Sequence, residues 1–163
     1  MLPTYLKMMI IRLERVVILF SKKQKEDLNE TLAQLTIPAF GYELIRETLL
    51  KDLLGKDYKS ILYWGGKNLA RKFPLGNIDE IIHFFETSGL GNLSVSKENK
   101  NDMIFELTSD LITNRFERDC EYSYQLEAGF LAEQLQNIKS KEAETMEHQK
   151  KKSNTVIFTV QWD

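Results

Sequence analysis

Residues 63–75 read YWGGKNLARKFPL and place two adjacent glycines in the middle of a predicted helix. The helix is predicted over residues 58–73, because apolar side chains recur there at spacings of three and four and Pro74 ends the pattern. Each glycine costs about 1 kcal/mol relative to alanine inside a helix, so a contact at this point must offset the cost. We expect another helix or strand to pass where a Cβ atom would not fit. The alternative is room for a ligand beside Gly65, which lies on the apolar line.

Two further helices are predicted in the first half of the chain. One follows Thr36, whose residue type caps helix N-termini, and ends at Gly55. Its apolar positions are Tyr42, Ile45, Leu49 and Leu53, and its other side carries the charged residues Glu43, Arg46, Glu47 and Lys51. The second helix begins at Asn77, where Glu80 completes a capping box. The first half is therefore predicted to form a layer of amphipathic helices.

The second half of the chain alternates with a period of two, which is typical of strands. Residues 93–107 predict a hairpin with one buried face, because Leu93, Phe105 and similar apolar residues alternate with residues of the other face around a polar turn. Residues 142–162 predict a second hairpin, whose turn is the lysine-rich segment 150–154. Its first strand is predicted to lie at the edge of the sheet.

A helix between the two hairpins combines large apolar residues with small ones. Its apolar stripe consists of Tyr124, Ala128, Leu131, Leu135 and Ile138. Such a stripe usually faces the core, and a seam for a partner helix is the alternative. Ala128, Gly129 and Ala132 permit close approach of another element. Cys120, near the start of this helix, is predicted to be a buried thiol, with reactivity or acylation as the alternative.

Composition excludes several classes of protein. The 163 residues suit one domain. Lys and Arg total 22 and Asp and Glu total 24, which gives a net charge of -2. A chain with this charge has no strong positive electrostatic field to attract a polyanion, so we expect no nucleic-acid partner. One cysteine allows neither an internal disulfide nor a thiolate zinc site, and we expect no metal and no cofactor. General bases and nucleophiles are scarce and no catalytic motif is present, so an enzyme is the less favoured interpretation.

Residues 1–35 are predicted to lie outside the domain, which spans residues 36–163. Two apolar patches, 8–11 and 16–20, are separated by charged residues, so neither a secretory apolar region nor a membrane span is present. The interpretations are a helix packed on the domain, a partly disordered tail, or an over-called start with the true start near Leu19. We expect a cytoplasmic protein without a membrane span.

The central block resembles a known family. Residues 63–75, followed by EII at 80–82 and FF at 84–85, are similar to the YslB-like proteins of Gram-positive bacteria, and the similarity runs from about Pro38 to Asp163. More distantly, LEAGFLA at 126–132 is similar to a helix of the 4-vinyl-reductase-type ligand-binding domains. Those domains share their fold with the TRAPP vesicle-tethering subunits and the haem-dependent nitric-oxide sensors. The resemblance implies helices packed on an antiparallel sheet, dimers formed through helices and, in several members, a pocket for an apolar molecule or an acyl chain.

Together these observations predict a single α+β domain, with a helical layer packed on an antiparallel sheet of two hairpins, as in the TRAPP-like ligand-binding fold. The leading hypothesis is a non-enzymatic, homodimeric module that binds an apolar small molecule or a protein partner. The alternatives are a purely structural homodimer without a ligand and a reductase- or lyase-like enzyme acting on a cyclic substrate. Small residues beside large apolar ones leave either a groove or a tight seam. On that basis the candidate residues for a ligand pocket or dimer seam are Trp64, Gly65, Gly66, Leu69, Ala128, Gly129, Phe130 and Leu131.

Overall fold

The computed structural model describes residues 29–118 and 120–163, and the chain divides into two compact units, residues 1–36 and 37–163. The interpretations given above for residues 1–28 lie outside the described residues. In the second unit the elements are α2 (Ala39–Glu43), the π-helix η1 (Leu44–Leu49), α3 (Leu50–Leu54), the short 3-10 helix η2 (Gly55–Asp57), α4 (Tyr58–Lys72), α5 (Ile78–Thr87), β1 (Asn92–Glu98), β2 (Asp102–Thr108), α6 (Asp110–Phe116), α7 (Gln125–Lys139), β3 (Ala143–Lys150), the 3-10 helix η3 (Lys151–Ser153) and β4 (Thr155–Trp162).

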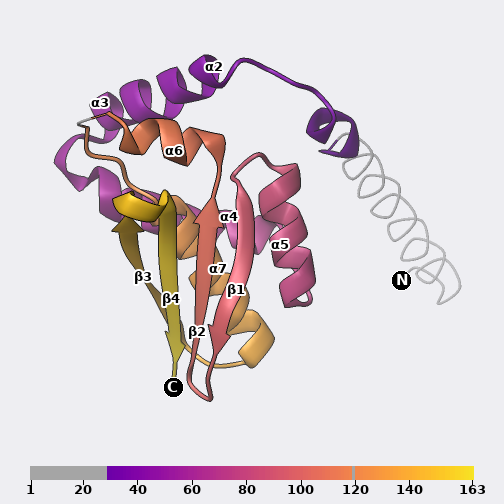
Figure 1. Ribbon diagram of the computed structural model, residues 1–163. Coiled ribbons are helices and arrows are strands. Elements are labelled where there is room, and N and C mark those ends of the chain that lie inside the picture. The colour runs from indigo at the N-terminus through magenta and orange to yellow at the C-terminus, as the bar shows by residue number, and fades with distance from the viewer. Residues whose placement is uncertain (1–28, 119) are drawn as a thin grey trace, which may run out of the picture. The chain divides into compact units, whose positions relative to one another are not determined.

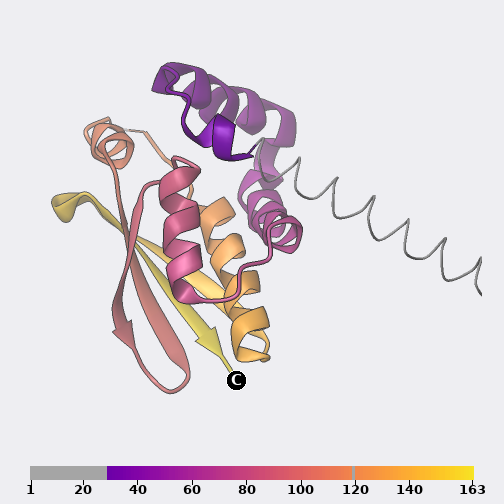
Figure 2. The same cartoon turned by 90° about the vertical axis from the view of Figure 1, so that its right-hand side faces the viewer.

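Four strands form one antiparallel sheet in the order β1-β2-β4-β3. Helices α4, α5 and α7 lie on one face of this sheet, as the two views in Figures 1 and 2 show. The alternation of apolar residues follows from this arrangement, because Phe105 of β2 lies opposite Phe158 of β4 and both are fully buried against the helices. The predicted α+β fold with two hairpins is confirmed, and β3 is an edge strand as expected.

Helix α7 lies between the sheet and α4 and is buried on both sides. Phe130, Leu131 and Leu135 have no exposed surface, and the Phe130 ring stacks on Phe84 with centroids 4.7 Å apart. The apolar stripe of this helix therefore faces the core of its own chain, which was the first of the two interpretations.

Helix ends are set by local capping. The Asn77 side chain accepts a hydrogen bond from the Glu80 N–H at 2.9 Å, and the Glu80 carboxylate accepts one from the Asn77 side-chain amide at 2.7 Å. Gly55, with φ of 58°, ends α3. Ser109 caps α6 by accepting a hydrogen bond from the Ile112 N–H. No helix within the described ranges has both the length and the apolar character that a membrane crossing requires.

Candidate functional site

The glycines singled out in the sequence lie where α4 crosses α7. A Cβ atom built on Gly66 would lie 2.0 Å from the carbonyl oxygen of Leu126, and one built on Gly129 would lie 1.9 Å from that of Tyr63. Both helices therefore meet backbone to backbone, and the predicted close approach is confirmed. The contact falls at Gly66 rather than at Gly65, where the nearest atom to a built Cβ is a Leu126 methyl carbon at 3.8 Å.

The eight residues predicted for a pocket or dimer seam fall into two groups. Ala128, Gly129, Phe130 and Leu131 are buried in α7, as is Gly66 in α4. Gly65 and Leu69 are partly buried, and Trp64 is 59% exposed. At Gly66 and Gly129 the space beside the backbone is filled by the other helix of the same chain, so neither a ligand nor a second copy fits between them.

Lys67 follows the glycines and is buried in spite of its charge. It is 5% exposed, and its ammonium group donates to the carbonyl oxygen of Ala143 at 3.4 Å and to the Glu144 carboxylate at 3.1 Å. The hydroxyl of neighbouring Tyr63 accepts a hydrogen bond from the Thr145 N–H and donates one to Glu144. These side chains satisfy backbone groups on the outer edge of β3, so α4 closes part of the sheet edge.

The helix formed by α2, η1 and α3 is amphipathic, but its orientation is unusual. Its apolar residues point away from the domain, with Phe40 and Leu53 each 70% exposed, Ile45 59%, Leu49 50% and Leu44 45%. We define the outer face of this helix as the exposed residues Phe40, Gly41, Leu44, Ile45, Thr48, Leu49, Asp52 and Leu53. A surface helix normally turns its apolar side to the core. Here none of the apolar residues of the helix is fully buried.

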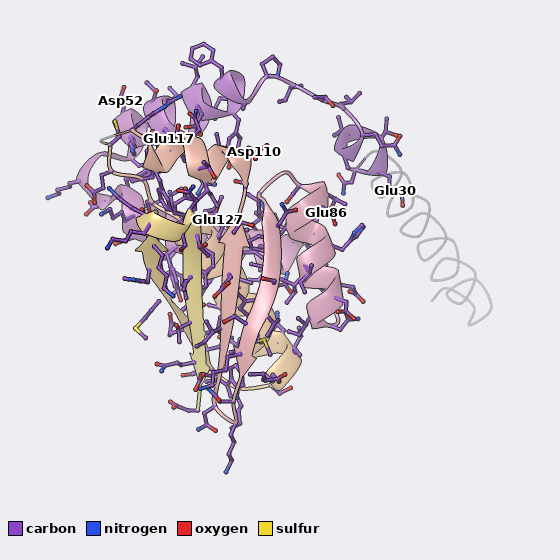
Figure 3. All side chains as sticks on the ribbon, in the orientation of Figure 1. Glu30, Asp52, Glu86, Asp110, Glu117 and Glu127 are labelled. Atoms are coloured by element: carbon purple, nitrogen blue, oxygen red, sulfur yellow. The ribbon has the colours of Figure 1, made fainter. Side chains whose placement is uncertain are left out.

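A buried ion pair holds the inner side of this helix. The guanidinium of Arg46 donates two hydrogen bonds of 2.7 Å to the Glu127 carboxylate of α7 and one of 3.1 Å to the carbonyl oxygen of Ser123. The Arg46 and Glu127 side chains are 4% and 2% exposed, and Figure 3 shows Glu127 inside the domain while Asp52 projects from the helix. Burial alone would lower the pKa of Arg46, but the charge of Glu127 outweighs it and raises the pKa well above its ordinary value.

One more ion pair and one hydrogen bond repeat this attachment along the helix. The buried guanidinium of Arg115 in α6 donates to the Glu43 carboxylate at 3.1 Å. The ammonium group of Lys51 lies 2.8 Å from Glu47 and also donates to the backbone of the segment before α7. Removing one partner of a buried pair leaves an uncompensated charge at high cost, so these contacts fix which side of the helix faces inward. The π-helix η1 contains Arg46 and Glu47, and such turns are frequent at functional sites.

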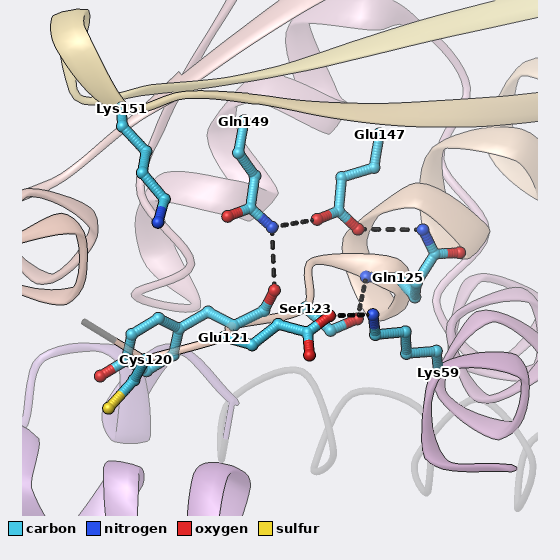
Figure 4. A pocket seen from close by; sticks show the side chains of 9 residues that line it. Lys59, Cys120, Glu121, Ser123, Gln125, Glu147, Gln149 and Lys151 are labelled. Atoms are coloured by element: carbon cyan, nitrogen blue, oxygen red, sulfur yellow. Dashed lines mark hydrogen bonds and ion pairs between the residues drawn. The ribbon is translucent and has the colours of Figure 1, made fainter. Parts of the chain in front are cut away.

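Two grooves adjoin this region. One, of about 550 Å³, lies between the helix and α6 and includes Phe40, Leu44 and Leu111 in its lining. The other, of about 630 Å³, is polar (Figure 4). In the polar groove Gln149 donates hydrogen bonds to Glu147 and to the backbone carbonyl oxygen of Tyr122. Gln125 also donates to Glu147, and Lys59 pairs with Glu121.

The thiol of Cys120 was predicted to be buried, and that prediction is wrong because the residue is exposed in the connection before α7. The described residues contain no group of three or more His, Cys, Asp or Glu side chains arranged to hold a metal ion. The polar groove therefore offers neither a metal site nor an evident nucleophile–base pair.

Comparisons with known proteins agree with this architecture. The chain is 46% identical over 134 residues to the uncharacterized protein YslB of Bacillus subtilis (strain 168), covering 82% of this chain and 90% of that protein. Among solved structures, a vinyl-4-reductase family protein from Methanocaldococcus jannaschii superposes with a TM-score of 0.64 at 18% identity, covering 88% of this chain and 94% of that one. A mutant H-NOX protein from K. algicida superposes with a TM-score of 0.52 at 10% identity, covering 79% of this chain and 75% of that one.

The two structural matches show a shared fold at low sequence identity, which says little about function. The sequence match is stronger, and residues 39–161 match the family described as protein of unknown function DUF2507. This range begins with α2 and ends within β4, so it includes both the α4–α7 crossing and the outer face. The chain therefore belongs to the DUF2507 family and is a YslB-like protein with the vinyl-4-reductase type of fold.

Proposed function

We propose that this protein is a cytoplasmic, non-enzymatic binding module and that the outer face of α2–η1–α3 receives its partner, an apolar small molecule or another protein. The observation that carries the proposal is the reversed orientation of this helix. Arg46 points inward to Glu127, while Phe40 and Leu49 point outward. Folding has turned the charged side toward the domain, and the apolar side stays exposed among the described residues.

Energetics support this interpretation. Apolar surface gains roughly 25 cal/mol for each Å² removed from water. The five large apolar side chains of the outer face present on the order of 500 Å² of surface, within the range of about 300–600 Å² that often marks a functional patch on a monomer. Single exposed apolar residues scattered over a surface need no explanation, but five large ones along one continuous helix form a single contact surface.

The buried charged cluster behind the helix supports a structural role better than a catalytic one. Burial raises the pKa of Tyr58 and that of Tyr124 to about 12 each. Burial would lower the pKa of Arg115, but its hydrogen bond to Glu43 helps to raise it overall. A general acid or base works best with a pKa near the operating pH, and these shifts all lead away from neutrality. The reductase- or lyase-like alternative is therefore the weaker one.

An apolar small molecule is a second candidate, because a groove adjoins the outer face. The groove of about 550 Å³ between the helix and α6 has the size of a small-molecule site, for which about 300–1,000 Å³ is usual. Phe40 and Leu44 belong both to the groove and to the outer face. A partner on the outer face and a ligand in the groove would therefore share these two side chains.

Native mass spectrometry of the full chain tests the proposal, with Leu49→Glu as the disruptive variant and Met146→Glu as its control. Met146 is 58% exposed on β3, so Met146→Glu adds the same charge as Leu49→Glu at a similarly exposed position away from the outer face. We expect a mass above the 19.1 kDa of one chain, from a bound protein or small molecule, in the wild type and in Met146→Glu only. A bare single-chain mass for all three proteins, with equal fluorescence of the apolar dye ANS, would contradict the proposal.

A further inference from the structure

We infer that the free edge of β3 over residues 145–149 binds an extended, acidic segment of another protein, which joins the sheet as an additional strand. We call these residues the open edge. The inference goes beyond the proposed function, because the open edge belongs to β3 and the outer face belongs to the helix over residues 39–54. It depends on the backbone groups of the open edge, on the groove beside them and on the lysines at its end.

The register of β3 with β4 decides which backbone groups point out of the sheet. In an antiparallel pair, alternate residues exchange both backbone hydrogen bonds with the facing strand, and the residues between them direct both groups the other way. The Thr145 N–H donates to the hydroxyl of Tyr63 in α4 at 3.2 Å, so Thr145 is one of the outward residues. Because the register continues without a shift, Glu147 and Gln149 also direct their N–H and C=O groups outward.

Helix α4 occupies only the first part of this edge. Next to the Tyr63 contact, the ammonium group of Lys67 donates to the carbonyl oxygen of Ala143 at 3.4 Å. Within the described ranges, the outward backbone groups of Glu147 and Gln149 have no hydrogen-bond partner. An extended polypeptide presents N–H and C=O groups at the matching spacing, and such main-chain bonds supply the affinity when a strand joins an open sheet edge.

The opposite edge of the sheet does not offer the same continuation. The pairing of β1 with β2 shifts register between Val95 and Lys97, and such a bulge disrupts the ladder and twists an edge strand away from further pairing. The pairing of β3 with β4 is continuous from Ala143 to Lys150, and its sequence AETMEHQK contains no proline. A further strand can therefore extend the ladder at the open edge of β3.

The polar groove of about 630 Å³ adjoins the open edge, because Glu147 and Gln149 belong to its lining. Figure 4 shows their side chains on one side of the groove and Lys59 on the other. Alternate side chains of an added strand point to the helix side of the sheet, where this groove gives them room. The Glu147 carboxylate already accepts hydrogen bonds from the Tyr124 N–H and the Gln125 side chain, so this wall is ordered before a partner binds.

Charge at the end of the groove favours an acidic segment. Lys150, Lys151 and Lys152 are exposed and form no ion pair within the described ranges, whereas Lys59 is paired with Glu121. Carboxylates beside the three lysines would be electrostatically complementary to them. An antiparallel strand is the slightly more stable choice, and its amino-terminal end lies beside the carboxyl end of β3. We therefore expect the acidic residues at the amino-terminal end of the added segment.

Fluorescence anisotropy with the full chain tests the inference. The probe is the fluorescein-labelled peptide Glu-Asp-Glu-Val-Thr-Val-Thr, and the control peptide carries Lys in place of each Glu and Asp. We expect saturable binding of the acidic probe and at least about tenfold weaker binding of the control peptide. Absence of saturable binding of the acidic probe up to about 1 mM, or equal binding of both peptides, would overturn the inference.

A matched pair of variants tests whether the backbone makes the contact. Gln149→Pro removes the outward N–H, whereas Gln149→Ala loses the same side chain and keeps the N–H. Proline is tolerated in an edge strand where the N–H faces out of the sheet. We expect Gln149→Pro to bind the acidic probe about tenfold more weakly than Gln149→Ala, and equal affinities would overturn the inference.

N-methylated probes make the same test from the side of the peptide, so that it stands even if Gln149→Pro fails to fold. Alternate N–H groups of an added strand face β3, and the others face solvent. One probe is methylated on the first set of alternate backbone nitrogens, and a second probe on the other set. We expect one of the two probes to lose binding and the other to keep it. Equal binding of both would mean that no strand ladder forms.

The proposed function and this inference can fail separately. Leu49→Glu changes the outer face and should bind the acidic probe with wild-type affinity. Loss of probe binding in Leu49→Glu would place the peptide on the outer face and overturn the inference, while it would agree with the proposed function. Self-association of the wild type that is lost in Gln149→Pro and kept in Gln149→Ala would mean that a second copy occupies the open edge, which would also overturn the inference.

Discussion

Replacing Gly66 by alanine tests the α4–α7 crossing most sharply. The new Cβ atom would lie 2.0 Å from the carbonyl oxygen of Leu126 and 2.7 Å from the backbone nitrogen of Phe130. Ordinary contacts between such atoms are about 3.5–4.0 Å, so the two helices would have to separate by roughly 1.5 Å. Both obstructing atoms belong to the backbone, which cannot move aside as a flexible side chain would.

The expected cost follows from where α7 lies. It has no room to retreat, because Phe130 and Leu131 are fully buried among the elements packed against it. Overpacking of a close-packed core costs about 1–3 kcal/mol, and a clash with backbone falls at the upper end. Alanine regains about 1 kcal/mol of helix propensity, so we expect Gly66→Ala to lose about 2 kcal/mol of unfolding free energy. For a chain of this length the melting temperature should fall by about 4–8 °C.

Gly65→Ala is the matched control for this prediction. Its new Cβ atom would make an ordinary contact, 3.8 Å from a methyl carbon of Leu126. The helix propensity gained should therefore raise the unfolding free energy by about 0.5–1 kcal/mol. Thermal and urea unfolding followed by circular dichroism measures both variants. If Gly66→Ala unfolds at or above the wild-type temperature, the backbone contact at the crossing is not as described.

Two further substitutions test the buried cluster. Glu127→Gln leaves the Arg46 charge without its main partner, so urea unfolding should show a loss of about 3–5 kcal/mol; the exposed control Glu98→Gln should lose less than about 1 kcal/mol. A loss as small as that of the control would mean that the pair does not hold the helix. Tyr58→Phe removes a buried hydroxyl that has no hydrogen-bond partner among the described residues, so the unfolding free energy should rise by about 1 kcal/mol, and a fall would contradict this. Burial raises the pKa of Tyr58 from 10.0 to about 12, so the stability contributed by its neutral form is complete below pH 10 and is lost as the pH rises toward 12. Between pH 10 and pH 12 the unfolding free energy should fall less steeply with rising pH for Tyr58→Phe than for the wild type. Equal pH slopes for the two proteins would refute this assignment.

Local rules explain how much of the fold was predictable. Capping at Asn77, the turn at Gly55 and the alternation along β4 depend on neighbouring residues, and the structure confirms each of them. The close approach at the glycine pair was also predictable, because a helix interior does not tolerate two glycines without a compensating contact. Which of the two glycines makes the contact was not predictable. The spacing of apolar residues along the helix places Gly65 on the apolar side, whereas the side that is buried in the structure contains Gly66, one position further on.

The orientation of the helix over residues 39–54 could not be read from its own pattern. Periodicity separates two sides of a helix but does not say which side faces inward. The decision depends on Glu127, which is distant in sequence and forms the buried pair with Arg46. One signal was available: Glu127 directly precedes Ala128 of the apolar stripe, and a charged residue at the border of a buried stripe requires a partner of opposite charge.

Hydroxyl-radical footprinting of the full chain, free and with its partner bound, tests most directly whether the outer face is an interface. Labelling of Phe40, Leu49 and Leu53 reports on the face, and Met146 serves as an internal reference of comparable exposure. The account predicts that labelling of the three outer-face residues falls when the partner binds, while Met146 stays equally reactive. Outer-face labelling that remains constant while the partner is shown to be bound would place the interface elsewhere and contradict the account.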